Sequence, residues 1–147
     1  MSLFTMYGLT LSIGTTQASS GGEWTYAEIC GINNVAEALN EVVQQYFFLC
    51  QEGFATNHVT GMAPAFTLTG RRIFGDAGQD YIFSKKYGLG TNRKSSVKIE
   101  YSDGTGNTTI TCDCTISNVQ EFSGETTDDS AISFELRLDG KPKVTTA

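Results

Sequence analysis

The stretch Thr109-Ile110-Thr111-Cys112-Asp113-Cys114-Thr115-Ile116-Ser117 decides the fold class. Every even position carries an apolar side chain and every odd position a polar one. Successive side chains of a β-strand point to opposite faces, so this alternation predicts a strand with one buried and one solvated face. Residues 97–101 and 132–138 repeat the pattern, and the turn-rich residues 102–107 predict a hairpin between the first two strands. We therefore expect three antiparallel strands in the C-terminal half.

Outward from these strands, further elements follow from local signals. Residues 9–13, 24–30 and 65–73 have strand character, and residues 14–22 form a glycine- and serine-rich loop. One helix is predicted over residues 77–87, with Asp76 as its N-cap, Gln79 as the capping-box partner and Gly88 as a left-handed stop. Residues 35–50 are ambiguous, because a segment with helical propensity runs into the strand-like aromatic residues 46–50.

Length and composition point to the same class. The chain has 147 residues, which predicts a single domain over residues 1–147. Only 18% of the residues are charged, against about 25% in an average domain, and there are 16 Gly. Such a composition disfavours a helical bundle and favours half-buried strands joined by glycine turns. The sequence shows neither a secretory signal nor a long apolar run, so we expect a protein kept in a reducing cytoplasm.

The net charge of −6 is unevenly distributed. Residues 1–70 contain no Lys or Arg, whereas residues 71–98 are basic and the remainder is acidic again. A solvated surface without function explains this pattern about as well as self-assembly, in which a basic patch on one copy meets acidic patches on the next. Affinity for nucleic acid is disfavoured, because phosphate binding needs an excess of cations.

No motif supports catalysis or a metal site. Cys112 and Cys114 share the apolar face of one strand, and together with Cys30 and Cys50 they lack zinc-site spacing, so we expect buried, reduced thiols. His58, the only histidine, is predicted to lie in a loop without a catalytic role, since no nucleophile motif accompanies it. We therefore predict no enzyme activity.

The order of these elements resembles a known family. The motifs that carry the resemblance are a glycine loop followed by the Trp24 strand, the segment Phe66-Thr67-Leu68-Thr69-Gly70-Arg71-Arg72, the helix that Gly75-Asp76 opens, and the terminal Gly140-Lys141-Pro142. In this order, and over nearly the whole chain, the sequence resembles the major tail (tail tube) proteins of long-tailed bacteriophages.

The resemblance implies a mainly β fold of two packed antiparallel sheets, sandwich- or barrel-like, with one flanking α-helix. It further implies an extended N-terminal arm (residues 1–8), a C-terminal tail (residues 140–147) and a strand within residues 42–52. The implied role is structural and needs no cofactor. Hexameric rings stack into a hollow virion tail tube, assembled in the host bacterial cytoplasm, through which the genome is ejected. The implied partners are further copies, the tape-measure protein, the tail terminator, and baseplate or distal tail proteins. Double-stranded DNA passes without specific binding, and no membrane is entered.

Two sets of residues follow from this resemblance as expectations. A weakly acidic lumen wall that repels phosphate would contain Asp113, Glu135, Glu41 and Glu52, although Arg137 would bind DNA there unless it is paired. Contacts between subunits would involve the basic block and the acidic segment 117–130, that is Arg71, Arg72, Lys85, Lys86, Arg93, Lys94, Glu121, Glu125, Asp128 and Asp129. Flexible loops over residues 1–8, 14–22, 53–63 and 117–130 would add further contacts.

One alternative remains from another functional class. This alternative is a carbohydrate-binding or adhesin-type β-sandwich module of a virion or cell surface. It would present exposed, clustered aromatic side chains near its loops, and Trp24 is the strongest candidate for such a residue.

Overall fold

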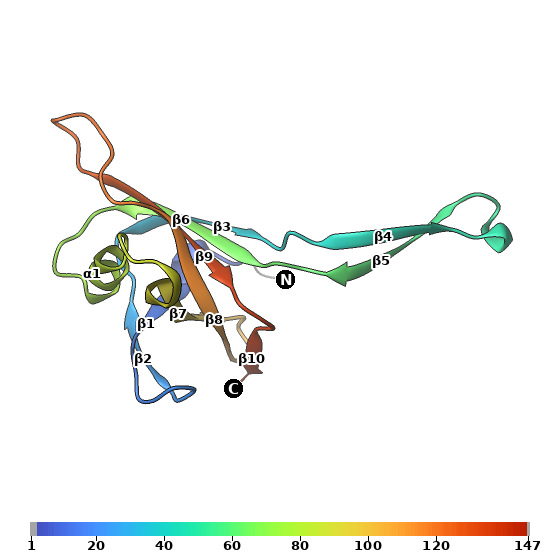
Figure 1. Ribbon diagram of the computed structural model, residues 1–147, viewed down its shortest axis with the longest axis horizontal. Coiled ribbons are helices and arrows are strands. Elements are labelled where there is room, and N and C mark those ends of the chain that lie inside the picture. The colour runs from blue at the N-terminus through green and yellow to red at the C-terminus, as the bar shows by residue number, and fades with distance from the viewer. Residues whose placement is uncertain (1–2, 147) are drawn as a thin grey trace.

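The computed structural model describes residues 3–146 and consists mainly of β-strands (Figure 1). The strands are β1 (Thr10–Gln17), β2 (Trp24–Glu28), β3 (Ile32–Ala38), β4 (Val42–Phe47), β5 (Ala55–Gly61), β6 (Ala65–Arg71), β7 (Lys94–Ser102), β8 (Asn107–Gln120), β9 (Ala131–Leu138) and β10 (Lys143–Thr146). The α-helix is α1 (Ala77–Ser84), and short 3-10 helices span Met6–Gly8, Leu49–Gln51 and Gly90–Arg93. No described helix is long and apolar enough to cross a membrane.

The strands form two antiparallel sheets. Eight strands make the large sheet, in the order β2-β1-β7-β8-β9-β6-β3 with β10 paired to β8, whereas β4 and β5 pair only with each other. β2 and β3 lie at opposite ends of that order, yet only residues 29–31 separate them along the chain. The large sheet therefore curls like a half-closed barrel. The predicted class, mainly β with antiparallel sheets and one flanking helix, is confirmed.

One apolar cluster fills the curled sheet. It draws on β1, β6, β7, β8, β9 and α1, and its most deeply buried side chains include Phe134, Ile13, Leu68 and Ile82. Along β8 the buried residues are Thr108, Cys112, Cys114 and Ile116, all at even positions, so the predicted alternation is confirmed. The register of β7, β8 and β9 confirms the three-stranded antiparallel arrangement of the C-terminal half.

Helix α1 begins where the sequence predicts and ends earlier. The Asp76 carboxylate accepts a hydrogen bond from the backbone N–H of Gln79 at 3.0 Å, as an N-cap does. The prediction that the helix continues to residue 87 is wrong, because it ends at Ser84. The Lys85 N–H donates to the carbonyls of Ile82 and Phe83, which tightens the last turn, and Gly88 does not adopt the left-handed conformation.

Gln79 holds α1 against the open side of the barrel. Its side chain does not complete a capping box. Instead its Nε2 donates to the carbonyl oxygens of Cys30 and Arg71, at 2.5 and 2.9 Å, and its Oε1 accepts from the N–H of Ile73 at 2.8 Å. A Cβ at Gly78 would lie 2.5 Å from the carbonyl oxygen of Glu28, so only glycine permits this approach. The helix thereby closes the gap between the two ends of the sheet.

The ambiguous segment 35–50 is extended, as the resemblance implied. It contains the end of β3, all of β4 and the start of the 3-10 helix Leu49–Gln51, and no α-helix. The predicted loop 53–63 is wrong, because it contains β5, which pairs with β4 residue by residue, for example Val43 with Val59 and Tyr46 with Thr56. Local periodicity missed β5 because neither of its faces is buried in the chain. The loops predicted over 14–22 and 117–130 are shorter, since β1 continues to Gln17 and β8 to Gln120.

Both ends of the chain contact the large sheet. Within the predicted N-terminal arm, the Phe4 ring packs edge-to-face on Tyr101 with centroids 5.9 Å apart. Within the predicted C-terminal tail, β10 pairs with β8, with Val144 opposite Ile110. Met1, Ser2 and Ala147 lie outside the described residues.

Candidate assembly surfaces

The most exposed apolar surface lies on the β4–β5 hairpin, residues 42–61, which we call the arm. The arm projects from the body of the molecule (Figure 1). Phe47, Leu49 and Phe54 are 66%, 103% and 74% exposed, and every residue of β4 is exposed. Glu52, at the tip, is the only Asp, Glu, Lys or Arg of the arm. An isolated two-stranded ribbon is marginally stable in water, and a large exposed apolar surface marks an interaction site.

Neither face of the arm has the charged side chains of a solvated surface. Val43, Phe47 and Val59 share one face, as the register and the alternation of side chains dictate. On the other face Tyr46 stacks on Phe48 with centroids 5.8 Å apart and meets the edge of His58 at 6.2 Å. Both faces are therefore suited to burial against other protein surfaces.

The second notable site is an ionic cluster beside α1. The Arg72 guanidinium, with 6% of its side chain exposed, lies 2.8 Å from the Glu121 carboxylate and 3.0 Å from that of Asp80. Lys86 Nζ lies 2.5 Å from the other oxygen of Glu121. The Arg72 guanidinium also lies between two rings, 4.2 Å from the Phe74 centroid and 4.8 Å from that of Phe83. The cluster joins the end of β6, α1 and the β8–β9 loop.

The pKa of Glu121 reflects this setting. Burial alone would raise the pKa of the carboxyl, but hydrogen bonds and Coulomb attraction from Lys86 and Arg72 outweigh burial and lower the pKa below its ordinary value. The same contact with Glu121 raises the pKa of Lys86. Glu121 is therefore held as a carboxylate between two cations.

The structure places most of the predicted intersubunit residues in contacts within one chain. Arg72 and Lys86 each pair with Glu121, and Arg71 Nη1 donates to the Asp129 carbonyl at 3.0 Å. Three others also have partners in the chain: Arg93 Nη1 donates to the Ile116 carbonyl, Lys94 pairs with Asp139, and Asp128 accepts from the N–H of Glu125. Lys85 lies 5.4 Å from the Tyr81 ring. The basic block does contact segment 117–130, but the contacts of Arg72 and Lys86 with Glu121, and of Arg71 with Asp129, lie inside one subunit.

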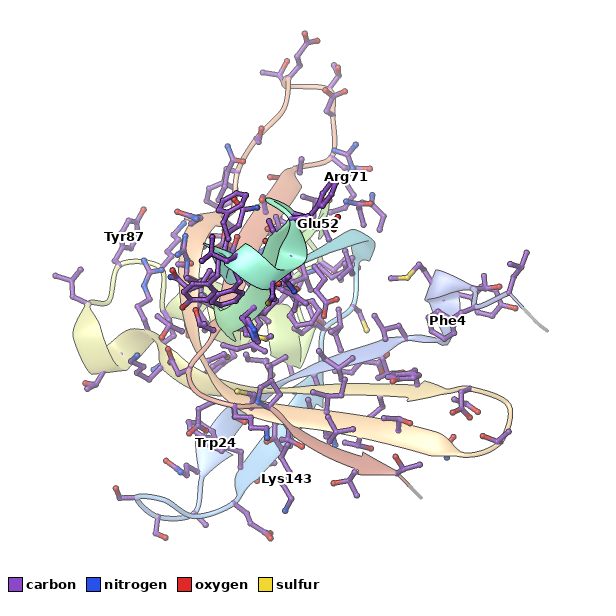
Figure 2. The ribbon with its side chains drawn as sticks, turned by 90° about the vertical axis from the view of Figure 1, so that its right-hand side faces the viewer. Phe4, Trp24, Glu52, Arg71, Tyr87 and Lys143 are labelled. Atoms are coloured by element: carbon purple, nitrogen blue, oxygen red, sulfur yellow. The ribbon has the colours of Figure 1, made fainter. Side chains whose placement is uncertain are left out.

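The predicted lumen residues fall in three places. Asp113 and Glu135 lie on the outer face of the large sheet, meaning the face turned away from the core, beside the half-buried hydroxyls of Thr115 and Ser117. Glu41 lies where β3 leads into the arm, and Glu52 lies at the arm tip, pointing toward the viewer in Figure 2. The structure therefore brings only Asp113 and Glu135 onto one surface.

Three cations near this outer face are neutralised. Arg137 Nε lies 2.6 Å from Glu135, Lys94 lies 3.1 Å from Asp139, and Lys98 lies 3.4 Å from Glu100. A cation paired with a carboxylate attracts phosphate less than a lone cation does. Arg137 was expected to bind DNA unless it is paired, and its contact with Glu135 meets that condition.

All four cysteines are reduced, and they differ in exposure. Cys112 and Cys114 are buried, and burial raises the pKa of both thiols, which makes them unreactive. The expectation of burial is wrong for Cys30, in the link between β2 and β3, and for Cys50, at the arm tip. His58 lies on β5 and not in a loop. The described residues contain no group of side chains arranged to hold a metal ion.

No protein-family model matches the chain, and no curated protein does. Solved structures that share its fold include two of a gene transfer agent particle and one of a tail tube. The tail of an empty gene transfer agent particle with C6 symmetry superposes with a TM-score of 0.70 at 10% identity, covering 97% of this chain and 99% of that one. The SPP1 tail tube gives 0.73 at 12% identity, covering 99% and 80%. A chain of the native gene transfer agent virion gives 0.63 at 11% identity, covering 97% and 99%.

Proposed function

We propose that this chain is the subunit of a phage-type tail tube, which polymerises as stacked hexameric rings into a hollow conduit for genome ejection. The observation that carries the proposal is the fold shared with the SPP1 tail tube, with a TM-score of 0.73 over 99% of the chain. A sixfold ring is favoured because the gene transfer agent tail that shares the fold has C6 symmetry.

The arm supports self-assembly independently of the comparisons. It exposes Phe47, Leu49 and Phe54 on a ribbon whose two strands pair only with each other among the described strands. Burying one large apolar side chain contributes roughly 1.5–3 kcal/mol, so a neighbouring copy that covers the tip would stabilise a polymer substantially. The arm then provides an apolar contact that joins neighbouring copies.

In the proposed tube, the outer face with Asp113 and Glu135 lines the lumen, and Glu41 lies near its rim. The hydroxyls and paired cations of this face support a polar wall of low net charge, along which double-stranded DNA passes without specific binding. Arg71, Lys85, Glu125 and Asp128 lie near the surfaces where copies meet. The ion pairs of Arg72, Lys86, Lys94 and Glu121, and the hydrogen bonds of Arg93 and Asp129, hold those surfaces in place within each copy. The expected partners are a tape-measure protein, a tail terminator and distal tail or baseplate proteins, and the expected location is the virion tail, after assembly in the host cytoplasm.

The solved structures that share the fold do not favour the adhesin alternative. Trp24, its strongest candidate, lies over Gly14 of the neighbouring strand β1, where an added Cβ would approach the indole to 2.8 Å. Its ring is therefore used for packing within the chain.

Negative-stain electron microscopy and sedimentation of the purified full-length chain test the proposal. We expect hollow tubes or sixfold rings that form in a concentration-dependent manner. A protein that stays monomeric at high micromolar concentration would contradict the proposal, and binding of that monomer to glycans would favour the adhesin class.

A further inference from the structure

A second exposed apolar cluster lies at the other end of the molecule from the arm tip. Phe74, Tyr87 and Phe122 are 73%, 88% and 63% exposed. Lys86 Nζ lies 5.0 Å from the Tyr87 ring centroid and 4.6 Å from that of Phe122, and Phe74 covers the Arg72 guanidinium. We call these three rings and the two cations between them the aromatic patch.

The patch is held in place by the ionic cluster beneath it. Glu121 pairs with Arg72, which directly follows β6, and with Lys86, which lies two residues after α1. Phe122 follows Glu121 along the chain. The three rings therefore sit on a fixed framework although they are exposed. A preorganised surface loses less entropy on binding than a flexible one.

The arm of a copy cannot reach its own patch. β6 begins at Ala65, next to the arm, and ends at Arg71, next to the patch, so the strand length separates the two surfaces. In Figure 1 the arm extends to the right while α1 lies at the left. Contact between an arm and a patch therefore needs two copies joined head to tail, and such heterologous contacts build rings or open stacks.

The chemistry of the two surfaces matches. The arm tip offers Phe47, Leu49 and Phe54, and its one charge is the carboxylate of Glu52. At the patch, Arg72 and Lys86 balance Asp80 and Glu121, and the neighbouring Lys85 is a local cation, while the acids Glu125, Asp128 and Asp129 lie farther along the β8–β9 loop. Apolar burial would provide affinity, and the opposite charges would set orientation.

A competing surface lies beside the N-terminal segment. A hollow of about 560 Å³ is lined by Leu3, Phe4, Tyr7 and Tyr101 among others, and Asp103 is the one charged residue of its described lining. An adjoining hollow of about 490 Å³ contains Glu28 and likewise no cation in its described lining. Both would repel Glu52. Figure 2 places Tyr87 and Phe4 on opposite sides of the molecule, so docking at one surface is distinguishable from docking at the other.

We propose that the arm tip of one copy docks on the aromatic patch of another copy, with Phe47, Leu49 and Phe54 against Phe74, Tyr87 and Phe122 and with Glu52 beside Lys85. This inference rests on the proposed assembly and specifies which surface of the neighbour receives the arm.

The native cysteine at the arm tip provides the test. In a Cys30→Ser background, Cys50 is the one exposed thiol of the described residues. Phe122→Cys places a partner thiol in the patch, and the matched control Tyr7→Cys places one beside the N-terminal hollow. Assembled protein is treated with a short bis-maleimide and separated on a denaturing gel, with Cys30→Ser alone as the baseline.

We expect a ladder of covalent oligomers for Phe122→Cys and only the baseline for Tyr7→Cys. Adding Cys50→Ser to Phe122→Cys should abolish the ladder. Tubes that form normally but cross-link through Tyr7→Cys, or through neither position, would overturn the docking site and leave the proposed function intact. Failure of the unaltered chain to assemble at all would overturn the proposed function itself.

Discussion

Arg72 shows how a residue's partners change its expected role. In the sequence it belongs to a basic run that suggests contacts between copies, whereas in the structure it is nearly buried and binds Glu121 and Asp80 of its own chain. Charge reversal at this position would therefore damage the subunit before it affected assembly. The position of the residue in the fold, and not its charge, decides its role.

We predict that Arg72→Ala destabilises the isolated chain by about 3 kcal/mol, because it leaves the Glu121 carboxylate largely desolvated with one partner lost. For a chain of this size that corresponds to a drop in Tm of roughly 6–12 °C. Chemical denaturation monitored by circular dichroism measures the free energy of unfolding. The matched control is Arg71→Ala, whose exposed side chain should cost no more than about 0.5 kcal/mol. Equal losses in the two variants would contradict the structural role of Arg72.

The lowered pKa of Glu121 predicts a contribution to stability that depends on pH. A carboxyl group whose pKa is lower in the folded chain than in the unfolded chain stabilises the fold above the unfolded pKa of about 4.3. That contribution is lost as the pH falls through the folded pKa. The free energy of unfolding of the unaltered chain should therefore exceed that of Glu121→Gln at pH 7, and the gap should narrow below about pH 4. Glu125→Gln, in the same loop, controls for the loss of one charge. A gap that stays constant from pH 7 to pH 3 would exclude this role of Glu121.

At the scale of elements, the sequence predicted the strands that have one buried face, because burial makes apolar and polar side chains alternate. The alternation in residues 97–101, 109–117 and 132–138 follows from one buried face, and the structure has β7, β8 and β9 at those places. The start of the helix at Asp76 could also be predicted, because an N-cap is a local signal. The end of the helix could not be predicted, because Gly88 suggests a left-handed stop and does not adopt that conformation.

The sequence could not reveal features that depend on distant partners. Gln79 fits a capping box by its spacing, but its amide is drawn to Cys30 and Arg71, which come from other elements. β5 carries no alternating pattern because neither of its faces is buried in the monomer. One signal for the arm was present: residues 42–70 contain Glu52 as their sole Asp, Glu, Lys or Arg, which is unusual for an exposed segment.

For the arm we predict that the double variant Phe47→Ser/Phe54→Ser folds normally but assembles poorly. Both rings are more than half exposed, so the free energy of unfolding of the monomer should change by less than about 0.5 kcal/mol per site. Losing the burial of even one ring at the interface removes roughly 1.5–3 kcal/mol, so the critical concentration for assembly should rise at least about tenfold. Pelleting across a concentration series measures this concentration.

Val144→Ser provides the comparison for the arm variant. Val144 is 60% exposed on β10, away from the arm, and its replacement should leave the critical concentration within about twofold. An arm double variant that pellets at the concentration of the unaltered chain would show that the arm does not join the copies.

At the scale of the whole molecule, three surfaces have different roles in the proposed tube. The curled sheet with its single core gives a rigid body, the arm and the aromatic patch at its two ends provide the contacts between copies, and the hydroxyl-rich outer face provides the wall. The negative charge of the chain, −6 in total, fits this division, because three cations of the outer sheet face, Arg137, Lys94 and Lys98, are paired with carboxylates. The low charge content is then a property of surfaces that must either be covered by another copy or avoid holding DNA.

A helical reconstruction of assembled protein by electron cryomicroscopy tests the central claim most directly. The account predicts a hollow tube of stacked rings with six copies each, in which Asp113 and Glu135 face the lumen and each arm is buried against a neighbouring copy. A solid or non-helical assembly, or a tube in which the outer face with Asp113 and Glu135 forms the exterior, would contradict it.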